Sequence, residues 1–547
     1  MTQPPPAPPR SLLLRTPALT LWLACGGALL AVAATAPFTR TQEARVLVVG
    51  RETADGQAEY WLIPRANGQV RLRKPPLTYW LAGLSFQVLG VSTFAGRLPM
   101  AISAWLLVGL TYRMGRRLLG HRAGLLAMGM LTSMYLLLRY GPLAETDTIA
   151  ALFVSLAIWA IWRGMDSGGQ NVSRPWLWYQ LSAIAMALAM LAKGPPAGFP
   201  LLFLLAMAAI RRTWRPLLDW LRSGAPLTFA VMGGWWWLAA WLHPSAHVIT
   251  EELERLTAGR GHFGWPWEIL GYLAKGTLPW VGFVVLAIVA AFIHQRGDQH
   301  LRGLLLWAGV ILLALAIVPQ KQEHYVITAL PPLALLVGWS IDRALDGSDP
   351  PLRRAMALVL GGTAIAGVAA AVAVPIAGRL VRGHAASVDA IVAAVLALSM
   401  TALLLLLHRR RLESSLGGAL LAGLLSMSLV LGPWSDSIAG LTDAEAARAI
   451  RQRFGAGPYA FHDPQDVDLE ICFELRQVVP AFSDDEALLR AAAATPRLVV
   501  LDLQHKSLPE EPRPGLVKEM EFQLKHEALR VYRMAGALAP STGQATP

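Results

Sequence analysis

The sequence predicts an all-α polytopic membrane protein that ends in a small α/β domain. Its 547 residues are 54% hydrophobic and only 15% charged, with a mean hydropathy of +0.44, whereas soluble domains are about 25% charged. Apolar runs of about 16–22 residues recur along the chain, and a helix needs this length to cross a bilayer. Short arginine clusters separate the runs, so the net charge of +12 indicates membrane topology and no nucleic-acid partner.

The N-terminal segment 1–16 is basic and rich in proline, which predicts a disordered cytoplasmic segment. The apolar run that follows, 17–37, contains "AVAA", which resembles a signal-peptide cleavage site. A first spanning helix is favoured, because many further apolar runs follow. With either interpretation, the segment after residue 38 lies outside the cytoplasm.

Thirteen spanning helices are expected. They lie near residues 17–37, 98–114, 122–139, 148–163, 177–192, 197–210, 226–242, 273–293, 303–318, 326–342, 355–376, 387–408 and 415–432. The run 76–92 is left out, because it begins in a pair of prolines and carries polar and aromatic residues; it is expected to lie at the membrane interface or to re-enter. This choice places arginine-rich connections such as "RMGRRLLGHR" (113–122) in the cytoplasm, as the positive-inside rule requires.

The topology divides the chain into a membrane domain and an extracytoplasmic domain. The membrane domain is 17–432, and its loops 38–97 and 243–272 lie outside the cytoplasm. Residues 433–535 are expected to form a periplasmic α/β domain, because "DAEAARAIRQRF" is an amphipathic helical pattern and "PYAFH", "RLVVLDL" and "ALRVYRM" are strand-like. The tail 536–547 is rich in Ala, Pro, Thr and Gly and is expected to be disordered.

Four lysines precede residue 330, and each lies beside an apolar run: Lys74, Lys193, Lys275 and Lys321. The topology places them at the outer face of the membrane, where positive charge does not help to set topology. A lysine ammonium is a compact charge that suits a phosphate, such as that of a lipid whose head group lies in the outer leaflet. Structural alternatives remain open, because Lys275 or Lys193 could snorkel and Lys74 could be an interfacial anchor.

Two carboxylates are expected on the same side. Glu43 and Asp147 lie near the ends of membrane segments, where ionisable groups are costly and often functional. Further polar residues are expected near them, namely Arg45, Arg255, His262, His324 and Tyr325. Structural roles remain open here as well. An acidic residue at Asp147 could cap a helix, and His324-Tyr325 could belong to an aromatic belt.

Carboxylates and cations at one face of an apolar bundle suit the transfer of a sugar from a lipid phosphate. A carboxylate can take the proton of an acceptor hydroxyl as that hydroxyl attacks the anomeric carbon. Cations stabilise the departing phosphate, and burial raises the pKa of the carboxylate toward neutrality. A soluble nucleotide sugar would need a cytoplasmic site, and the cytoplasmic connections carry no glycine-rich phosphate loop.

At these residues the sequence resembles the membrane-embedded GT-C glycosyltransferases of the protein O-mannosyltransferase type, and within them the bacterial aminoarabinose transferases that modify lipid A. The matching blocks are "QEARVLVVGRE" (42–52), "YWLIPRANGQVRLRKPPLTYW" (60–80), "GPLAETD" (141–147), "LAKGPPAGF" (191–199), "EELERLTAGRGHFGWPWEILGYLAKGTLPWVG" (251–282) and "KQEHYVITALPPLALL" (321–336). The resemblance implies thirteen spanning helices, an extracytoplasmic active site and a polyprenyl-phosphate sugar as donor. It also implies that Lys74, Arg255 and Tyr325 hold the lipid phosphate, and that Lys193 and Lys321 match family lysines.

Two departures from the family pattern bear on the site. The first-loop block of the family usually has Asp-Glu, whereas this chain has Gln42-Glu43. We therefore expect Glu43 to carry the carboxylate function, with Asp147 in support. The aminoarabinose branch has an acidic residue that can help to bind a metal just before the Lys-Pro block. That residue is Arg73 here, so we expect no metal site, and no cofactor is expected.

The sequence therefore predicts a glycosyltransferase of the bacterial inner membrane. It would move a sugar from polyprenyl (undecaprenyl) phosphate to lipid A, another glycan or a protein in the outer leaflet. The residues expected to bind substrate are Arg45, Lys74, Lys193, Arg255, His262, Lys321, His324 and Tyr325. Two alternatives remain. A polysaccharide polymerase or ligase would use a lipid pyrophosphate donor, and a transporter or flippase would place ionisable groups at midplane in repeated halves.

Overall fold

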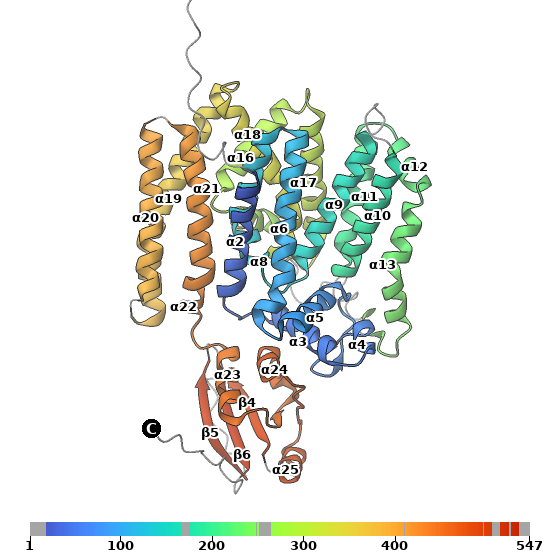
Figure 1. Ribbon diagram of the computed structural model, residues 1–547, viewed down its shortest axis with the longest axis vertical. Coiled ribbons are helices and arrows are strands. Elements are labelled where there is room, and N and C mark those ends of the chain that lie inside the picture. The colour runs from blue at the N-terminus through green and yellow to red at the C-terminus, as the bar shows by residue number, and fades with distance from the viewer. Residues whose placement is uncertain are drawn as a thin grey trace, which may run out of the picture.

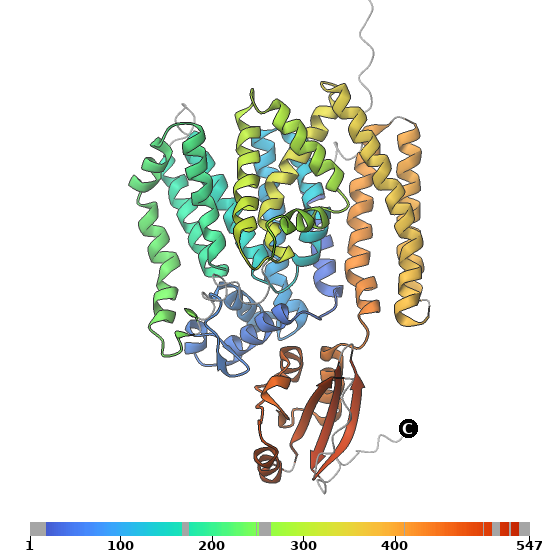
Figure 2. The ribbon, with the colours of Figure 1, turned by 180° about the vertical axis from the view of Figure 1, so that it is seen from behind.

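A computed structural model describes residues 18–166, 174–247, 249–250, 264–384, 386–409, 411–495, 497–505, 515–524 and 527–534. The expected N-terminal segment and C-terminal tail lie outside these residues. A bundle of long helices occupies one end of the molecule and a small mixed domain the other, with a layer of short helices between them (Figure 1 and Figure 2).

Nine helices in the described part of the chain are long and apolar enough to cross a bilayer. They are α2 (Ala18–Thr35), α6 (Thr93–Leu118), α9 (Asp147–Asp166), α10 (Pro175–Ala192), α17 (Gln299–Ile317), the short helix η2 (Glu323–Ala329) continued by α18 (Leu330–Leu345), α19 (Pro350–Arg382), α20 (Ser387–His408), and α21 (Leu412–Leu429) continued by η3 (Val430–Trp434) and α22 (Ser435–Ala439). The expectation of a polytopic helical membrane protein is thereby confirmed.

The other four expected spans are helical too, but they are shorter or bent. They comprise α7 (His121–Ser133) with α8 (Tyr135–Tyr140), η1 (Pro195–Gly198) with α11 (Phe199–Ile210), α13 (Ala225–Trp241), which α12 (Arg215–Arg222) precedes, and α15 (Glu268–Gly276) with α16 (Val281–His294). The last two helices meet at 113° and make a tenth span if they are taken together. Pro279 lies at this bend, and a proline cannot continue the hydrogen-bond ladder of a helix.

The intermediate layer comes from the first loop. It contains α3 (Thr41–Asp55), α4 (Glu59–Leu62), the hairpin strands β1 (Arg65–Ala66) and β2 (Gln69–Val70), and α5 (Leu77–Leu89). Asn67 and Gly68 form the hairpin turn with φ of 51° and 76°, the left-handed pair that a type I′ turn requires. The 13 residues of α5 reach about 20 Å, well short of a bilayer core of ~30 Å, and the helix lies in this layer (Figure 1).

The C-terminal domain packs helices against a four-stranded sheet. Its elements are α23 (Asp443–Phe454), β3 (Tyr459–Phe461), η4 (Pro464–Asp466), α24 (Leu469–Leu475), α25 (Asp485–Ala494), β4 (Val499–His505), β5 (Leu516–Gln523) and β6 (Glu527–Met534). The strand order is β3-β4-β6-β5, with β3 parallel to β4 and the other pairs antiparallel. The expected strands at β3, β4 and β6 are present. The edge strand β5 was not expected, and most of its residues are exposed or half-buried.

One continuous apolar core joins this domain to the intermediate layer. Leu47 of α3 and Phe86 of α5 belong to the same buried cluster as Ile450 of α23 and Phe473 of α24. The ring of Phe473 lies 5.8 Å from that of Phe38 and 6.0 Å from that of Phe86, measured between centroids. The domain is therefore packed against the membrane part through apolar surface and does not merely follow it on a linker.

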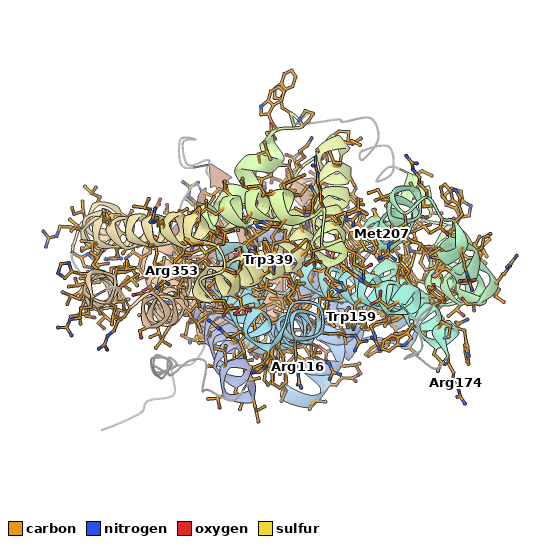
Figure 3. All side chains as sticks on the ribbon, turned by 90° about the horizontal axis from the view of Figure 1, so that it is seen from above. Arg116, Trp159, Arg174, Met207, Trp339 and Arg353 are labelled. Carbon is orange, nitrogen blue, oxygen red and sulfur yellow. The ribbon has the colours of Figure 1, made fainter. Side chains whose placement is uncertain are left out.

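Arginines gather at the far end of the bundle. Figure 3 looks onto the end away from the C-terminal domain and shows Arg116, Arg174 and Arg353 there. The charges at this end are partly paired, since Arg122 binds Asp342 at 2.9 Å and Asp346 at 2.8 Å. The two ends of the bundle therefore differ, with an arginine-rich face at one end and the intermediate layer at the other.

Candidate active site

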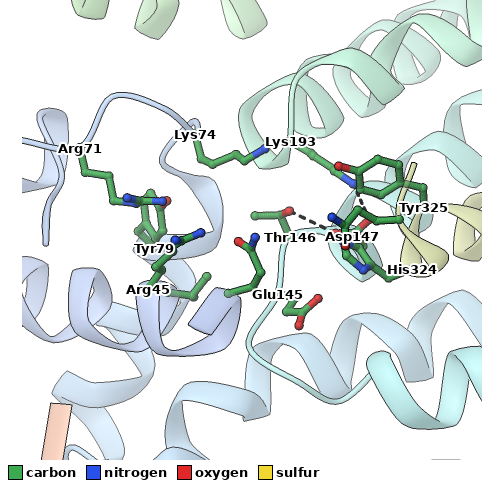
Figure 4. A pocket seen from close by; sticks show the side chains of 13 residues that line it. Arg45, Arg71, Lys74, Tyr79, Glu145, Thr146, Asp147, Lys193, His324 and Tyr325 are labelled. Atoms are coloured by element: carbon green, nitrogen blue, oxygen red, sulfur yellow. Dashed lines mark hydrogen bonds and ion pairs between the residues drawn. The ribbon is translucent and has the colours of Figure 1, made fainter. Parts of the chain in front are cut away.

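Two adjoining cavities lie where the bundle meets the intermediate layer. The first is small and polar (Figure 4), and its lining is Gln42, Arg45, Val46, Arg71, Lys74, Tyr79, Glu145, Thr146, Asp147, Lys193, Gln322, His324 and Tyr325. The second has a volume of about 770 Å³ and a mostly apolar lining that includes Phe199, Trp237, Trp241, Leu315 and Val318. Four residues line both cavities, namely Lys74, Asp147, Lys193 and Tyr325. A polar chamber thus opens onto an apolar one.

Some of the charged side chains that line the two cavities lie at helix ends. Asp147 is the first residue of α9, where free backbone N–H groups and the helix dipole favour a negative charge. Lys193 directly follows the last residue of α10, and Gly194 comes next with φ of 93°, a conformation that glycine adopts readily and that turns the chain into η1. Tyr325 lies in η2, directly before α18. Three segments, α9, α10 and η2, therefore meet at their ends.

Asp147 is the centre of the polar contacts. Its carboxylate accepts a short hydrogen bond from Lys193 Nζ, and Thr146 Oγ1 donates to its Oδ2 at 3.4 Å. His324 Nε2 lies 3.8 Å from the same oxygen. Lys193 Nζ also stands 3.8 Å from the centroid of the Tyr325 ring, within the range of a cation–π contact. The structure thus brings together the predicted Asp147, Lys193, His324 and Tyr325.

Glu145 is a second carboxylate in the pocket lining, and it is only 4% exposed. Arg40 Nε donates to its Oε1 at 2.6 Å, and the Arg40 guanidinium lies over the ring of Tyr140. Burial raises the pKa of Glu145 to about 7, although Arg40 opposes the shift. The sequence analysis chose Asp147 as the carboxylate of this segment, gave Glu145 no part in the site and did not identify Arg40.

Glu43 lies away from the pocket. It is fully buried and accepts from Arg97 Nε at 2.7 Å and Nη2 at 2.8 Å, and from the backbone N–H of Ala144 at 3.0 Å. Successive residues of a helix point about 100° apart, so α3 turns Gln42 toward the pocket and Glu43 toward the core. Glu43 as the general base stays a prediction, and its contacts favour a structural role.

The remaining predicted residues divide into three groups. Arg45 and Lys74 line the polar cavity. Lys321 Nζ donates to the backbone carbonyls of Gly264 at 2.6 Å and Val318 at 2.7 Å, and among the described residues it is not part of either lining. Arg255 and His262 lie outside the described residues. Lys275, the weakest of the four lysines by sequence, is half exposed and pairs with Glu323 at 2.5 Å.

Several lining residues were not assigned to the site by sequence reasoning. Arg71 lies three residues before Lys74 in the same connection, so its position beside the lysine was a usable signal. Tyr79 belongs to the run 76–92, which was expected only to lie at the membrane interface or to re-enter, and Gln322 carried no signal of its own. These residues reach the pocket because α3, α5 and η2 fold over the start of α9, which no local pattern encodes.

Three side chains have the spacing of a metal site. Ligand atoms of Glu145, Asp147 and His324 lie within 4.8 Å of one another, and carboxylate and imidazole groups are common metal ligands. Both carboxylates already accept hydrogen bonds from cationic side chains, Lys193 and Arg40. These partners supply the positive charge that a metal would bring, so the donor set fits neutralisation by side chains better. The expectation of no metal site stays a prediction.

Comparisons of sequence place the chain among known proteins. The model of a family described as dolichyl-phosphate-mannose-protein mannosyltransferase matches residues 73–237. An undecaprenyl phosphate-alpha-4-amino-4-deoxy-L-arabinose arabinosyl transferase of Pseudomonas paraeruginosa is 27% identical over 323 residues, and that of Edwardsiella ictaluri is 26% identical over 322. Each alignment covers 57% of this chain and 57% of the relative. The chain therefore matches little more than half the length of these curated relatives.

Comparison of structures covers nearly the whole chain. ArnT from Cupriavidus metallidurans bound to undecaprenyl phosphate superposes with a TM-score of 0.77 at 20% identity, over 95% of this chain and 99% of that protein. The apo state of the same protein gives 0.75 at 17% identity. Identities this low establish the fold alone. The chain is thus similar in sequence over residues 73–237 to the protein-mannosyltransferase family model and over about half its length to aminoarabinose transferases, and it shares the fold of ArnT.

Proposed function

We propose that the protein is a glycosyltransferase that moves a sugar from a polyprenyl phosphate, such as undecaprenyl phosphate, to a lipid, glycan or protein acceptor in the outer leaflet. The observation that carries the proposal is the junction of two cavities. A polar chamber with carboxylates and cations opens onto an apolar space of about 770 Å³, and Lys74, Asp147, Lys193 and Tyr325 line both. A donor with a charged head and a long hydrocarbon tail needs this combination.

The two parts of the donor fit the two cavities. Arg45, Arg71, Lys74 and Lys193 line the polar cavity, and such side chains bind phosphate through charge-assisted hydrogen bonds. The polyprenyl tail would follow the apolar wall, which includes Trp237 and Trp241 of α13. The sequence relatives are undecaprenyl phosphate-aminoarabinose arabinosyl transferases and ArnT binds undecaprenyl phosphate, which supports a donor of this class.

The transfer step needs a proton acceptor and a stabilised leaving group. The acceptor oxygen would form the new bond to the anomeric carbon, while the bond from that carbon to the phosphate oxygen breaks and its electron pair leaves with the phosphate. A pocket carboxylate, Asp147 or its neighbour Glu145, would receive the hydroxyl proton. The arginines and lysines would stabilise the charge that grows on the leaving phosphate. Glu43 would act on this step indirectly, by fixing α3 through Arg97.

The proposal places the pocket on the extracytoplasmic side. Arg116, Arg174 and Arg353 lie at the opposite end of the bundle (Figure 3), and arginine-rich ends favour the cytoplasm. Residues 17–432 would then form the catalytic membrane domain, and 433–535 the periplasmic domain. A flippase is disfavoured, because the ionisable residues of the pocket gather near one end of the bundle.

Analysis of lipids tests the function directly. Purified full-length protein in nanodiscs receives a polyprenyl-phosphate sugar and an outer-leaflet lipid fraction that contains lipid A. The expected result is free polyprenyl phosphate together with one acceptor species heavier by one sugar residue, both detected by mass spectrometry. Cells without the gene should lack the heavier species. If the wild-type protein consumes no polyprenyl-phosphate sugar but cleaves lipid pyrophosphate glycans, the polymerase or ligase alternative replaces the proposal.

A substitution of Asp147 tests whether this carboxylate takes part in the transfer step. Asp147→Asn removes a charge from the centre of the pocket and should lower the transfer rate by at least ~100-fold. Lys275→Gln serves as the matched variant, because its ion pair with Glu323 is half exposed and Lys275 is outside both linings in the described residues. It should keep nearly full activity. Full activity in Asp147→Asn would show that this carboxylate does not take part.

A further inference from the structure

Helix α3 lines the pocket with one face and packs against the C-terminal domain with another. Gln42, Arg45 and Val46 line the polar cavity. Arg51, nine residues beyond Gln42 and hence half a helical turn away in direction, is 2% exposed and faces α24. The wall of the pocket and the seam between the domains are therefore opposite sides of one helix.

Arg51 binds the end of α24. Its Nη1 donates to the carbonyls of Cys472 at 2.5 Å and Phe473 at 3.4 Å, and its Nη2 donates to the carbonyl of Gln477 at 3.1 Å. The last carbonyls of a helix have no partners within the helix, and a cation at this end also suits the helix dipole. The planar fork of arginine spans these carbonyls with two nitrogens, whereas a lysine would donate from a single nitrogen.

A second tie joins the same seam to the segment that carries Lys74. Asn67 in the hairpin turn donates from Nδ2 to the carbonyl of Val479 at 2.8 Å and accepts from the N–H of Val479 at 2.7 Å. The N–H groups of Asn67 and Gly68 donate to the Glu52 carboxylate of α3 at 2.7 and 3.0 Å. The hairpin is thus fixed to α3 and to the C-terminal domain at once, and it leads directly into Arg71 and Lys74.

We propose that the C-terminal domain is a positioning element of the pocket, with Arg51 as its principal positioning residue. By holding α3 and the connection 65–74 together, it fixes the places of Arg45, Arg71 and Lys74, which would bind the donor phosphate. The contribution to donor binding rests on the proposed function, whereas the mechanical link does not. The apolar contacts of Phe473 with Phe38 and Phe86 hold the C-terminal domain against the intermediate layer. The hydrogen bonds of Arg51 and Asn67 fix its exact position on that layer.

Hydrogen exchange of the full-length protein tests the mechanical link without any substrate. Arg51→Gln is compared with Arg453→Gln, which removes an exposed arginine that pairs with Glu519 inside the same domain. Arg51→Gln should speed exchange in α3 and in residues 65–74 by about tenfold, since charge-assisted hydrogen bonds restrain local opening. Arg453→Gln should leave these segments unchanged. Exchange that increases only within the C-terminal domain would overturn the proposal.

Kinetics test the consequence for the pocket. Arg51→Gln should raise KM for the polyprenyl-phosphate sugar about tenfold with a much smaller change in kcat, because misplaced cations weaken phosphate binding. Asn67→Ala provides an independent variant with the same expected direction. A fall in kcat at unchanged KM would indicate loss of folded protein only and would contradict a positioning role. If the wild-type protein transfers no sugar, the proposed function is wrong, and the exchange result alone decides the mechanical link.

Discussion

At the scale of single residues, the pocket is built from ion pairs that would be costly if either partner were removed. Asp147 and Lys193 are largely shielded from solvent and bind each other directly, and taking two charges out of water costs free energy that their attraction only partly returns. The presence of this ion pair is therefore poor evidence that it stabilises the folded protein. Under the proposed function, the pair is a charge arrangement that an incoming phosphate would enter, with Lys193 held against the Tyr325 ring.

The titration of Glu145 predicts a pH dependence of the reaction. Burial raises its pKa to about 7, so the carboxyl is largely protonated at pH 6 and ionised at pH 8. If Glu145 accepts the proton, single-turnover transfer should rise with pH through about 7 and then level off. Glu145→Gln should abolish this rise and lower the plateau by ~100-fold or more, and Glu145→Asp should keep the rise.

One outcome would assign this pH dependence to another group. A rise that persists in Glu145→Gln would show that another group titrates.

The raised pKa of Glu145 also has a consequence for stability. Because the carboxyl keeps its proton in the folded state above the unfolded value of 4.5, this residue lowers the free energy of unfolding as pH increases toward 7. Glu145→Gln should therefore change stability less at pH 5 than at pH 8.

The Glu43–Arg97 ion pair predicts that a substitution of Glu43 lowers the stability of the protein and leaves the catalytic step intact. Glu43→Gln would leave the buried Arg97 guanidinium without its counter-charge, which should lower the free energy of unfolding by about 3–5 kcal/mol. Glu59→Gln is the control, since it removes the exposed pair with Arg65 at 3.0 Å and should cost under ~1 kcal/mol. Thermal unfolding of both variants decides. A Glu43→Gln protein that unfolds like the wild type yet transfers no sugar would restore Glu43 as the base.

At the scale of elements, α24, which packs against α3, carries one buried acid, Glu470. Glu470 is 5% exposed, and burial together with Asp468 and Asp443 raises its pKa to about 9. The pKa of Asp443 rises to about 6 for the same principal reason. A carboxyl whose folded pKa exceeds its unfolded value destabilises the fold progressively as pH increases between the two values. The seam should therefore be firmest in mild acid and weaken toward alkaline pH.

Replacing this glutamate tests the sign of the effect. Glu470→Gln imitates the protonated form, so it should raise the melting temperature by several degrees at pH 9 and change it little at pH 5. Glu486→Gln, at an exposed position of α25, should have no pH-dependent effect. A larger gain at pH 5 than at pH 9 would mean that Glu470 is ionised in the folded protein.

At the scale of the whole molecule, the orientation in the membrane follows from the difference between the two ends. Gln69→Cys is at the exposed hairpin beside the pocket, and Arg117→Cys is at the exposed arginine-rich end. The native Cys25 and Cys472 are buried, so they should contribute little background. In sealed cells, a membrane-impermeant maleimide should label position 69 and not position 117. The reverse pattern would place the pocket in the cytoplasm.

The sequence determined the elements of this fold but not the contacts between them. Apolar length fixed the spanning helices, since any segment that crosses a bilayer must satisfy its backbone hydrogen bonds internally. The short run 76–92 was separated from them by its prolines and polar residues. Period and residue type likewise identified three of the four strands of the C-terminal domain. The edge strand β5 escaped, because its mostly exposed residues give no buried stripe to detect.

Only the tertiary structure decided which side chains share the pocket. The structure brings together Asp147, Lys193, His324 and Tyr325, which the sequence analysis had placed on one side of the membrane. The sequence analysis favoured Glu43 as the carboxylate, with Asp147 in support, whereas Gln42 and Glu145 line the pocket. Adjacent residues of a helix point about 100° apart, so the direction of Gln42 or Glu43 depends on what α3 packs against. That partner is Arg97 on one side and the C-terminal domain on another, both distant in sequence. Chemistry can therefore be inferred from residue types, whereas its exact carboxylate depends on how long-range packing rotates one helix.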